Sequence, residues 1–220
     1  KFIYKTIIFS VLTLLFLVSV NYWGDSAKIF HPGYEKKIAD IIFENQNATN
    51  ISNYDERILQ NELINRLHTN PDILILGSSR TMLINSTFFV EKNVINNSVS
   101  GASIEDLIAI YQIYNEKEIL PKKIILGIDP WLLNENNGQI RWKSLEKEYA
   151  SFSNERKERN KSILNNEVKQ LFSFSYFQAS FKNLPNVIKG KSEPIASNEK
   201  YNQTTTKLVD ASLSYGKKYR

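Results

Sequence analysis

A pair of serines follows a short apolar run that ends in glycine. Residues 73–76 are all Ile or Leu, Gly77 closes the run, and Ser78, Ser79 and Arg80 come next. A hydroxyl on a sharp turn at the end of a buried strand is a frequent arrangement for a serine nucleophile. Ordinary strand-to-helix turns are also rich in Ser and Gly. The motif by itself leaves both interpretations open.

The residues after these serines add two further expectations. Met82, Leu83 and Ile84 form the apolar start of a predicted helix, whose N-terminus would direct backbone N–H groups at a developing anion. Arg80, at the start of that helix, would bind a phosphate or carboxylate of a substrate, or else form a surface ion pair.

Two more turns follow apolar runs further along the chain. Residues 94–96 lead into the small-residue turn 97–103, and residues 124–126 lead into Gly127-Ile128-Asp129. Helical patterns separate the three runs, which predicts right-handed βαβ crossovers and a parallel sheet. The carboxyl ends of parallel strands meet at one edge, where open α/β sheets bind ligands. The three turns are therefore expected to lie together.

These turns resemble the sequence blocks of the SGNH/GDSL hydrolase superfamily. Gly77-Ser78-Ser79 is similar to the Gly-Asp-Ser block, with Ser78 in place of Asp and Ser79 as the nucleophile. Residues 97–101 are similar to the second block, and the resemblance implies that the Gly101 N–H helps to form the oxyanion hole. It also implies an α/β fold with a three-layer, flavodoxin-like parallel sheet.

Within this superfamily, the chain looks most like the membrane-anchored branch that modifies bacterial cell-surface polymers. That branch includes the D-alanyl transfer protein of teichoic-acid D-alanylation and the O-acetyltransferases of exopolysaccharides. The resemblance implies serine-dependent acyl transfer to a polysaccharide or teichoic acid, or ester hydrolysis on such a polymer, without a cofactor. It also implies a membrane-bound acyltransferase as a partner.

The chain departs from the family pattern in its third block. Asp129 stands where the family has an asparagine whose amide donates a hydrogen bond to the oxyanion. A carboxylate accepts hydrogen bonds and, when ionised, repels developing negative charge. Either Asp129 is turned away and another group donates, or the oxyanion hole is weaker.

The second departure concerns the catalytic base. The family carries an Asp-x-x-His block near its C-terminus, whereas this chain has only His31 and His68, both before Ser79 and both expected to be surface or packing residues. A doubly wound sheet usually has about five strands, and only three are predicted here, with none after residue 130. Both observations predict that the domain continues beyond Arg220. The alternative function is a non-catalytic domain of this fold that binds a glycan or a membrane partner.

The N-terminal residues predict a single membrane-spanning helix. Residues 2–23 are long and apolar enough to cross a bilayer, Lys1 and Lys5 mark the cytoplasmic side, and Tyr22 and Trp23 suit the far interface. A cleaved signal peptide is the rival interpretation, but no Ala-x-Ala-like site follows the apolar stretch. We therefore expect an uncleaved anchor in the cell membrane with the rest of the chain extracytoplasmic.

The remaining elements follow from apolar spacing. Helices are predicted at about 32–45, at 55–69 with an apolar stripe of leucines, and from Ser103, which starts a capping box. Loops are predicted at 46–54 and 190–206, and an exposed helix at 144–157. Residues 163–181 carry Phe174, Phe177 and Phe181 at helical spacing, which indicates packing against the domain or, alternatively, a lid or a wall for an acyl chain. We divide the chain into an anchor (1–24), a helical lead-in (25–70), the α/β core (71–133) and a helical insertion with a polar tail (134–220).

Composition excludes several classes of protein. Without cysteine there is no disulfide and no thiolate metal site, and no His, Asp and Glu cluster has metal-ligand spacing. The net charge is +5, and residues 187–220 hold seven Lys or Arg against three Asp or Glu. This basic tail would be solvated or would touch anionic lipid or cell-wall polymer. No groove-reading or basic-aromatic motif for nucleic acid is present.

Overall fold

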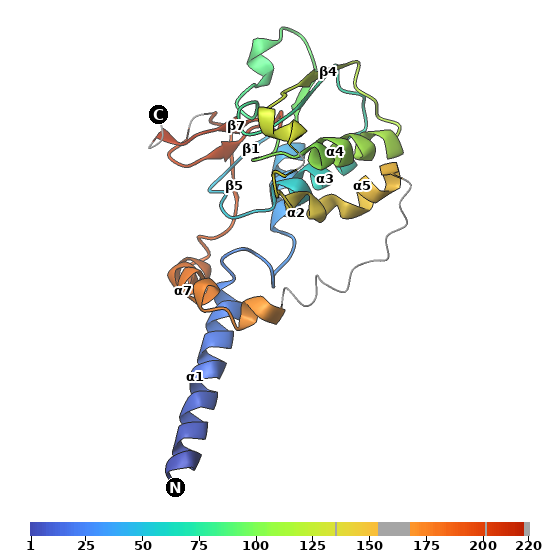
Figure 1. Cartoon of the computed structure of the whole chain (residues 1–220). Helices are drawn as coiled ribbons and strands as arrows, with labels where there is room; N and C mark the ends of the chain where they lie inside the picture. The colour runs from blue at the N-terminus through green and yellow to red at the C-terminus, as the bar shows by residue number, and fades with distance from the viewer. Residues whose placement is uncertain (135, 154–167, 201, 218–220) are drawn as a thin grey trace. The chain divides into compact units, whose positions relative to one another are not determined.

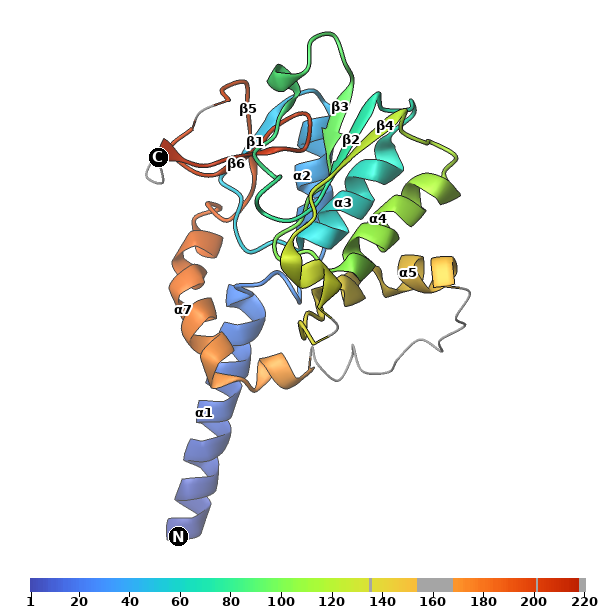
Figure 2. The same ribbon diagram turned by 45° about the horizontal axis from the view of Figure 1, so that its top comes forward.

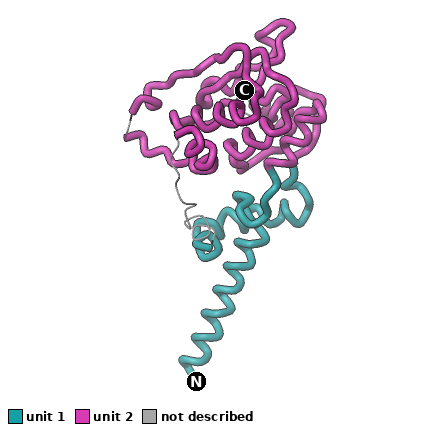
Figure 3. Tube along the Cα trace, turned by 90° about the vertical axis from the view of Figure 1, so that its right-hand side faces the viewer, with its two compact units in different colours: residues 1–34, 158–193 teal, residues 35–157, 194–220 magenta. Residues whose placement is uncertain are grey.

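The computed structural model describes residues 1–134, 136–153, 168–200 and 202–217 (Figure 1). The chain forms two compact units, each made of two stretches of sequence (Figure 3). Unit 1 contains residues 1–34 and 158–193, and unit 2 contains residues 35–157 and 194–220.

Unit 2 is built on a three-stranded parallel sheet. Its strands are β2 (Ile73–Leu76), β3 (Val94–Asn96) and β4 (Lys123–Leu126), in the order β3-β2-β4. β2 is buried along its whole length and is hydrogen-bonded on both sides, with Ile75 opposite Asn96. The predicted parallel sheet and its three strands are confirmed.

Helices cover one face of this sheet, as Figure 2 shows for α3 and α4. Leu74 and Leu76 point to that face and pack with Ile64 of α3 and with Ile110 and Tyr114 of α4. The unit contains α2 (Tyr34–Phe43), α3 (Glu56–Arg66), α4 (Ile104–Glu116) and α5 (Glu146–Ser153).

The opposite face of the sheet is covered differently. Ile73, Ile75 and Val94 pack against Ile84 and Phe89, which belong to the irregular segment after β2. The three-layer arrangement implied by the resemblance is therefore present only in part, because no helix follows β2 directly.

The caps of the helices agree with the sequence. The Asp55 carboxylate accepts hydrogen bonds from the N–H groups of Arg57 and Ile58 at 2.8 and 3.2 Å, which begins α3. Ser103 and Asp106 form the predicted capping box of α4. Both helices therefore start at polar side chains that satisfy N–H groups of the first turn.

The predicted helix at Met82–Ile84 is wrong. The chain forms turns there, followed by the short 3-10 helix η1 (Ser86–Phe88). The Asn96 amide donates to the carbonyls of Thr81 and Ile84, each at 2.8 Å, and Leu213 N–H donates to the Met82 carbonyl at 2.7 Å. Since a helix would need these carbonyls for its own bonds, the tertiary partners override the apolar signal. Arg80 accordingly lies in a turn.

A second, antiparallel sheet was not predicted. We predicted loops at 46–54 and 190–206 and no strand after residue 130. These predictions are wrong, because the strands of the second sheet lie there. The strands have only two or three residues each, and β1 pairs with segments about 150 residues away, so no local apolar period marks them. They are β1 (Asn47–Thr49), β5 (Ile195–Ser197), β6 (Thr206–Lys207) and β7 (Leu213–Ser214), in the order β5-β1-β6-β7.

β4 differs from the buried strand that the sequence predicts. It lies at one edge of the parallel sheet, and its Ile124 and Leu126 side chains are 45% and 49% exposed. The apolar run is therefore genuine, but these two side chains line a cavity that they share with residues of α4 and do not pack into the core.

Unit 1 contains the N-terminal helix and one long helix from the second half of the chain. α1 (Phe2–Gly24) has a mean hydropathy of 2.2 over an 18-residue window and is the one described helix that is long and apolar enough to cross a membrane. The hydroxyls of Thr6, Thr13 and Ser19 each donate to the carbonyl four residues earlier in the helix, at 2.7 to 3.2 Å. This agrees with the predicted apolar span.

The helices predicted around residues 144–157 and 163–181 are present in part. α5 ends at Ser153, and residues 154–157 and 163–167 lie outside the described residues. α7 (Phe174–Ile188) carries the predicted stripe, but Phe174 and Phe181 are 63% and 54% exposed. The predicted packing against the domain is therefore wrong for these two rings, and a lid or a wall for an acyl chain stays a prediction.

Candidate functional site

The ends of the three parallel strands are linked by hydrogen bonds. Val99 N–H donates to the Gly77 carbonyl at 3.0 Å, and Gly127 N–H donates to the Leu76 carbonyl at 2.7 Å. The hydroxyls of Thr81 and Ser98 lie 2.8 Å apart. The three turns predicted to meet at one edge of the sheet are therefore in direct contact.

The two serines of the first turn have opposite environments. Ser78 is fully buried and its Oγ accepts the Arg80 N–H at 3.3 Å, whereas Ser79 is exposed. Among the described residues, nothing hydrogen-bonds the Ser79 hydroxyl or receives its backbone N–H. Ser79 therefore presents both a reachable hydroxyl and an uncommitted donor at the edge of the sheet.

Gly77 allows the first and third turns to come close together. A Cβ built on Gly77 would lie 2.6 Å from Thr81 Oγ1 and 3.1 Å from the Gly127 Cα. No side chain fits between these backbones, so only glycine permits this approach. The glycine that ends the apolar run thus has a packing role beside the serines.

Gly101 lies in a left-handed turn, with φ of 52°. Its carbonyl accepts a hydrogen bond from Gln139 Nε2 at 2.7 Å, and its N–H donates to no described residue. The Arg141 guanidinium lies against it, since a Cβ on Gly101 would be 2.5 Å from Arg141 Nη2. Sequence reasoning missed Gln139 and Arg141, which come from a polar stretch with no recognisable spacing.

Asp129 is buried, with 4% of its surface exposed, and its carboxylate lies 3.2 Å from Arg80 Nη1. The Arg80 guanidinium also lies over the Trp131 ring, 5.2 Å from its centroid. The Trp131 indole N–H donates to the Ala102 carbonyl at 3.1 Å, next to Gly101. Arg80, Asp129 and Trp131 therefore connect the first, second and third turns through side chains.

The second turn is held from beneath by the first turn of α3. Arg57 is 2% exposed and donates two hydrogen bonds of 2.9 Å to Asp106, and a third of 3.0 Å to the Ser100 carbonyl. The Glu56 carboxylate accepts hydrogen bonds from the Ser100 N–H and from its hydroxyl, the latter at 2.7 Å. We call Glu56, Arg57, Ser100 and Asp106 the α3 clamp. The only signal for it in the sequence is a charged residue on the apolar face of a predicted helix.

A buried lysine lies in the electrostatic field of this clamp. Lys207, on β6, is 1% exposed, and burial lowers its pKa to about 8, while the charges of Glu56 and Asp210 oppose that shift. Sequence reasoning placed Lys207 in a solvated basic tail, and burial of its side chain corrects that prediction.

No histidine of unit 2 lies at this edge. His68, its one histidine, precedes β2, so it lies at the amino end of that strand, exposed and next to the Phe43 ring. His31 belongs to unit 1, where its Nδ1 lies 3.0 Å from the Asp25 carboxylate. The described residues also hold no group of three or more His, Cys, Asp or Glu side chains that could bind a metal ion.

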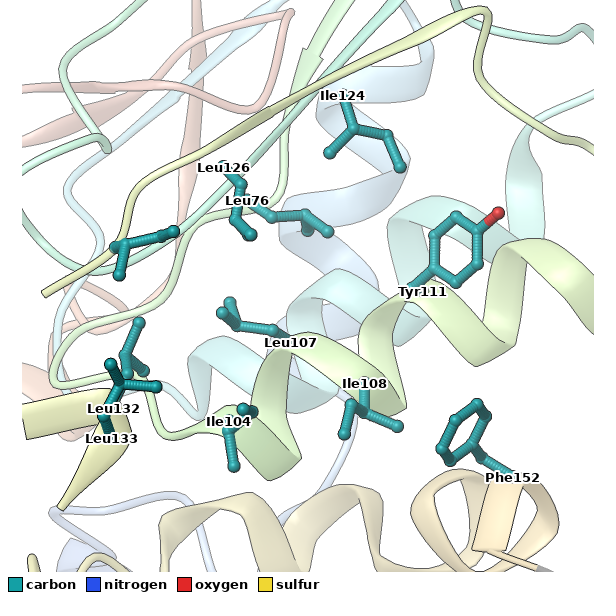
Figure 4. A pocket seen from close by; sticks show the side chains of 11 residues that line it. Leu76, Ile104, Leu107, Ile108, Tyr111, Ile124, Leu126, Leu132, Leu133 and Phe152 are labelled. Carbon is teal, nitrogen blue, oxygen red and sulfur yellow. The ribbon is translucent and has the colours of Figure 1, made fainter.

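An apolar cavity of about 380 Å³ lies beside the site, between β4 and α4 (Figure 4). Leu76 at the end of β2 and Ile128 next to Asp129 belong to its wall, together with Leu107 of α4 and Phe152 of α5. The Tyr111 hydroxyl is the only polar atom among the side chains drawn in Figure 4. A cavity of this composition favours apolar occupants, since polar ones would lose their hydrogen bonds to water.

Comparisons with protein-family models, with curated proteins and with solved structures found no match to this chain.

Proposed function

We propose that this chain is a membrane-anchored, extracytoplasmic enzyme that transfers an acyl group through Ser79 to a cell-surface polymer, or hydrolyses an ester on one. The observation that carries the proposal is an exposed Ser79 on a turn that is hydrogen-bonded to the second turn, through the Val99 N–H and the Gly77 carbonyl. The Ser79 hydroxyl is accessible, and the N–H groups of Ser79 and Gly101 donate to no described residue. Two such donors are what an oxyanion hole requires.

In this mechanism the Ser79 Oγ attacks the carbonyl carbon of an acyl donor and loses its proton to a base. The oxygen of the tetrahedral intermediate accepts hydrogen bonds from the N–H groups of Ser79 and Gly101. The donor's leaving group takes up the proton and departs, which leaves an ester on Ser79. A polymer hydroxyl or water then attacks that ester and regenerates the serine. Since His68 lies at the other end of β2, it is not the base in this proposal.

The proposed location follows from α1 and the residues after it. The Asp25 carboxylate accepts N–H groups of Ile29, Phe30 and His31 at 2.8 to 3.1 Å, and the Asn21 amide donates to the Leu171 carbonyl at 2.8 Å. A folded loop at this point supports an uncleaved anchor over a signal peptide, because cleavage needs an accessible segment after the apolar stretch. Lys1 and Lys5 would then stay in the cytoplasm.

Labelling with a serine-reactive fluorophosphonate tests the nucleophile. The full chain should be labelled, and Ser79→Ala should abolish the labelling. Ser78→Ala is the matched control and should keep it, because the Ser78 hydroxyl is buried and accepts the Arg80 N–H. Equal labelling of the wild type and Ser79→Ala would exclude Ser79 as the nucleophile.

A second candidate function is a non-catalytic domain that binds a glycan or a membrane partner. It is favoured by Asp129, a buried carboxylate paired with Arg80 where an amide donor is expected, and by the lack of a histidine near the turn of Ser79 in unit 2. If the folded wild-type chain takes up no fluorophosphonate, this second function is preferred.

A further inference from the structure

α7 is fixed to the last turns of α1. A Cβ at Gly24 would collide with the Ser180 carbonyl, so the two helices touch backbone to backbone. The Asn183 amide donates to the Gly24 carbonyl at 2.7 Å, and the Tyr176 hydroxyl donates to Asp25 at 2.7 Å. α7 is therefore held at the C-terminal end of the apolar helix by both packing and hydrogen bonds.

The surface of α7 has three distinct faces. Tyr176 and Ser180 are buried and face α1. A second face carries Phe174, Phe177 and Phe181, whose rings stack with centroids 6.0 and 5.8 Å apart, and Ile188 continues it. We call these four residues the phenylalanine stripe. The third face is polar and exposed, and consists of Ser175, Gln178, Lys182 and Asn186.

The phenylalanine stripe is continuous with the apolar surface of α1. The rings of Phe177 and Phe16 meet edge to face, with centroids 5.9 Å apart. Phe16 is 56% exposed and lies in the apolar span, while Tyr22 and Trp23, further along α1, are 42% and 62% exposed. Aromatic rings at the end of a spanning helix mark the membrane–water interface. Phe16 precedes Trp23 by about two helical turns, so the stripe meets α1 on the lipid side of this boundary.

The charge of α7 suits that position. α7 contains no Asp or Glu, and Lys182 and Lys189 are exposed. A helix with aromatic side chains on one face and lysine on a polar face is typical of interfacial membrane binding.

We propose that α7 lies in the outer interface of the membrane, with the phenylalanine stripe in the acyl-chain region and Lys182 and Lys189 among anionic lipid headgroups. This inference rests on the proposed membrane-spanning role of α1 and is independent of Ser79. The occupant of the stripe is lipid, because the stripe is joined through Phe16 to a surface that lipid would already cover. α7 would then be a second contact with the bilayer.

Single-cysteine labelling of the full chain tests this placement, since the natural sequence has no cysteine. The environment-sensitive fluorophore nitrobenzoxadiazole is attached to Phe174→Cys and Phe181→Cys in vesicles of phosphatidylcholine and phosphatidylglycerol. Ser175→Cys and Asn186→Cys, on the polar face of the same helix, are the matched controls. All four side chains are exposed, so the substitutions leave the contacts with α1 intact.

Lipids that carry a nitroxide should quench the labels at 174 and 181 at least about twofold more than those at 175 and 186, and aqueous iodide should show the reverse order. Equal quenching by iodide at all four positions would overturn the inference. Protection at 174 and 181 from both quenchers would also overturn it, because it would show that protein, such as a second copy of the chain, covers the stripe.

A label at Leu12→Cys separates this inference from its premise. Leu12 is 60% exposed in the middle of α1 and should be quenched by lipid nitroxide alone if α1 spans the bilayer. Lipid quenching at 12 without quenching at 174 and 181 would contradict the placement of α7 only. Iodide quenching at 12 would contradict the anchor and, with it, the proposed role of α7.

Discussion

The Arg80 guanidinium lies 3.2 Å from the buried carboxylate of Asp129, and this pair joins the first and third turns of the candidate site. The carboxylate stands where an amide donor is expected by resemblance, but its charge has a neighbouring cation. The same guanidinium covers the Trp131 ring. Of the two roles predicted for Arg80, an ion pair is present, and binding of an anionic substrate stays a prediction.

Replacing Asp129 with Asn should increase the reactivity of Ser79. The substitution removes a negative charge from the third turn and supplies an amide donor in its place. We expect the rate of fluorophosphonate labelling of Ser79 to rise by about tenfold, below the 10²- to 10³-fold that one oxyanion donor can contribute. A lower rate in Asp129→Asn would instead show that the carboxylate assists the reaction.

The α3 clamp should contribute strongly to the stability of unit 2. Arg57→Met leaves the Asp106 carboxylate buried without its cation, and we expect the free energy of unfolding to fall by about 3–5 kcal/mol. Urea titration of the full chain in detergent micelles, followed by tryptophan fluorescence, measures this change. Arg66→Met, on the same helix, should cost less than about 1 kcal/mol, because its ion pairs with Asp40 and Glu62 are partly exposed.

A double substitution checks that the cost of Arg57→Met arises from the unpaired charge. Asp106→Asn removes the charge and keeps an oxygen that can accept the Ser103 N–H. Adding it to Arg57→Met should restore part of the lost stability. If the double variant is less stable than Arg57→Met alone, the two side chains act independently and the clamp is not an ion-pair unit.

Lys207 should make the stability of the fold depend on pH. Burial lowers the pKa of Lys207 from 10.5 to about 8, so between these values the unfolded lysine holds a proton that the folded one has lost. The free energy of unfolding should therefore rise with pH across this window, by on the order of 3 kcal/mol over the whole interval between the two pKa values. Below pH 8 the cost of burying the charged form is present in full.

The measurement is best made between about pH 7 and 9.5, because Tyr114 and Tyr176 oppose the trend at higher pH. Burial raises the pKa of both phenols, so the folded state keeps protons that the unfolded state loses above about pH 10. Lys207→Met is the control and should flatten the rise in the urea midpoint below pH 9.5. A wild-type midpoint that is already flat there would contradict the assignment.

The sequence was informative where the signal is local. Apolar runs identified β2 and β3, leucine spacing identified α3, and the Ser103 capping box identified the start of α4. These features depend on a few consecutive residues, so they can be recognised without a partner. The helix predicted to start at Met82 does not form, because the Met82 carbonyl accepts the Leu213 N–H and the Ile84 carbonyl accepts the Asn96 amide. The strands β5, β6 and β7 were not predicted, because their pairing partners are distant in the sequence or because the strands are too short to show a pattern.

The same distinction applies to the candidate site. The three turns could be placed at one edge because parallel strands put their carboxyl ends together. The α3 clamp, Gln139 and Arg141 could not be predicted, since each acts through one contact with a distant backbone group. The one sequence signal for such contacts is a polar residue on the buried side of a predicted helix, such as Arg57 or Gln60.

Beneath the second turn, the Asn97 amide reaches two helices at once. It donates to Gln60 Oε1 on α3 and accepts the Tyr114 hydroxyl of α4 at 2.5 Å, and all three side chains are fully buried. Sliding either helix by one turn, about 5.4 Å, would strand a buried polar group at a cost of about 1–3 kcal/mol. Leucine and isoleucine side chains alone would tolerate several such offsets. Asn97 therefore selects one register for both helices on the sheet.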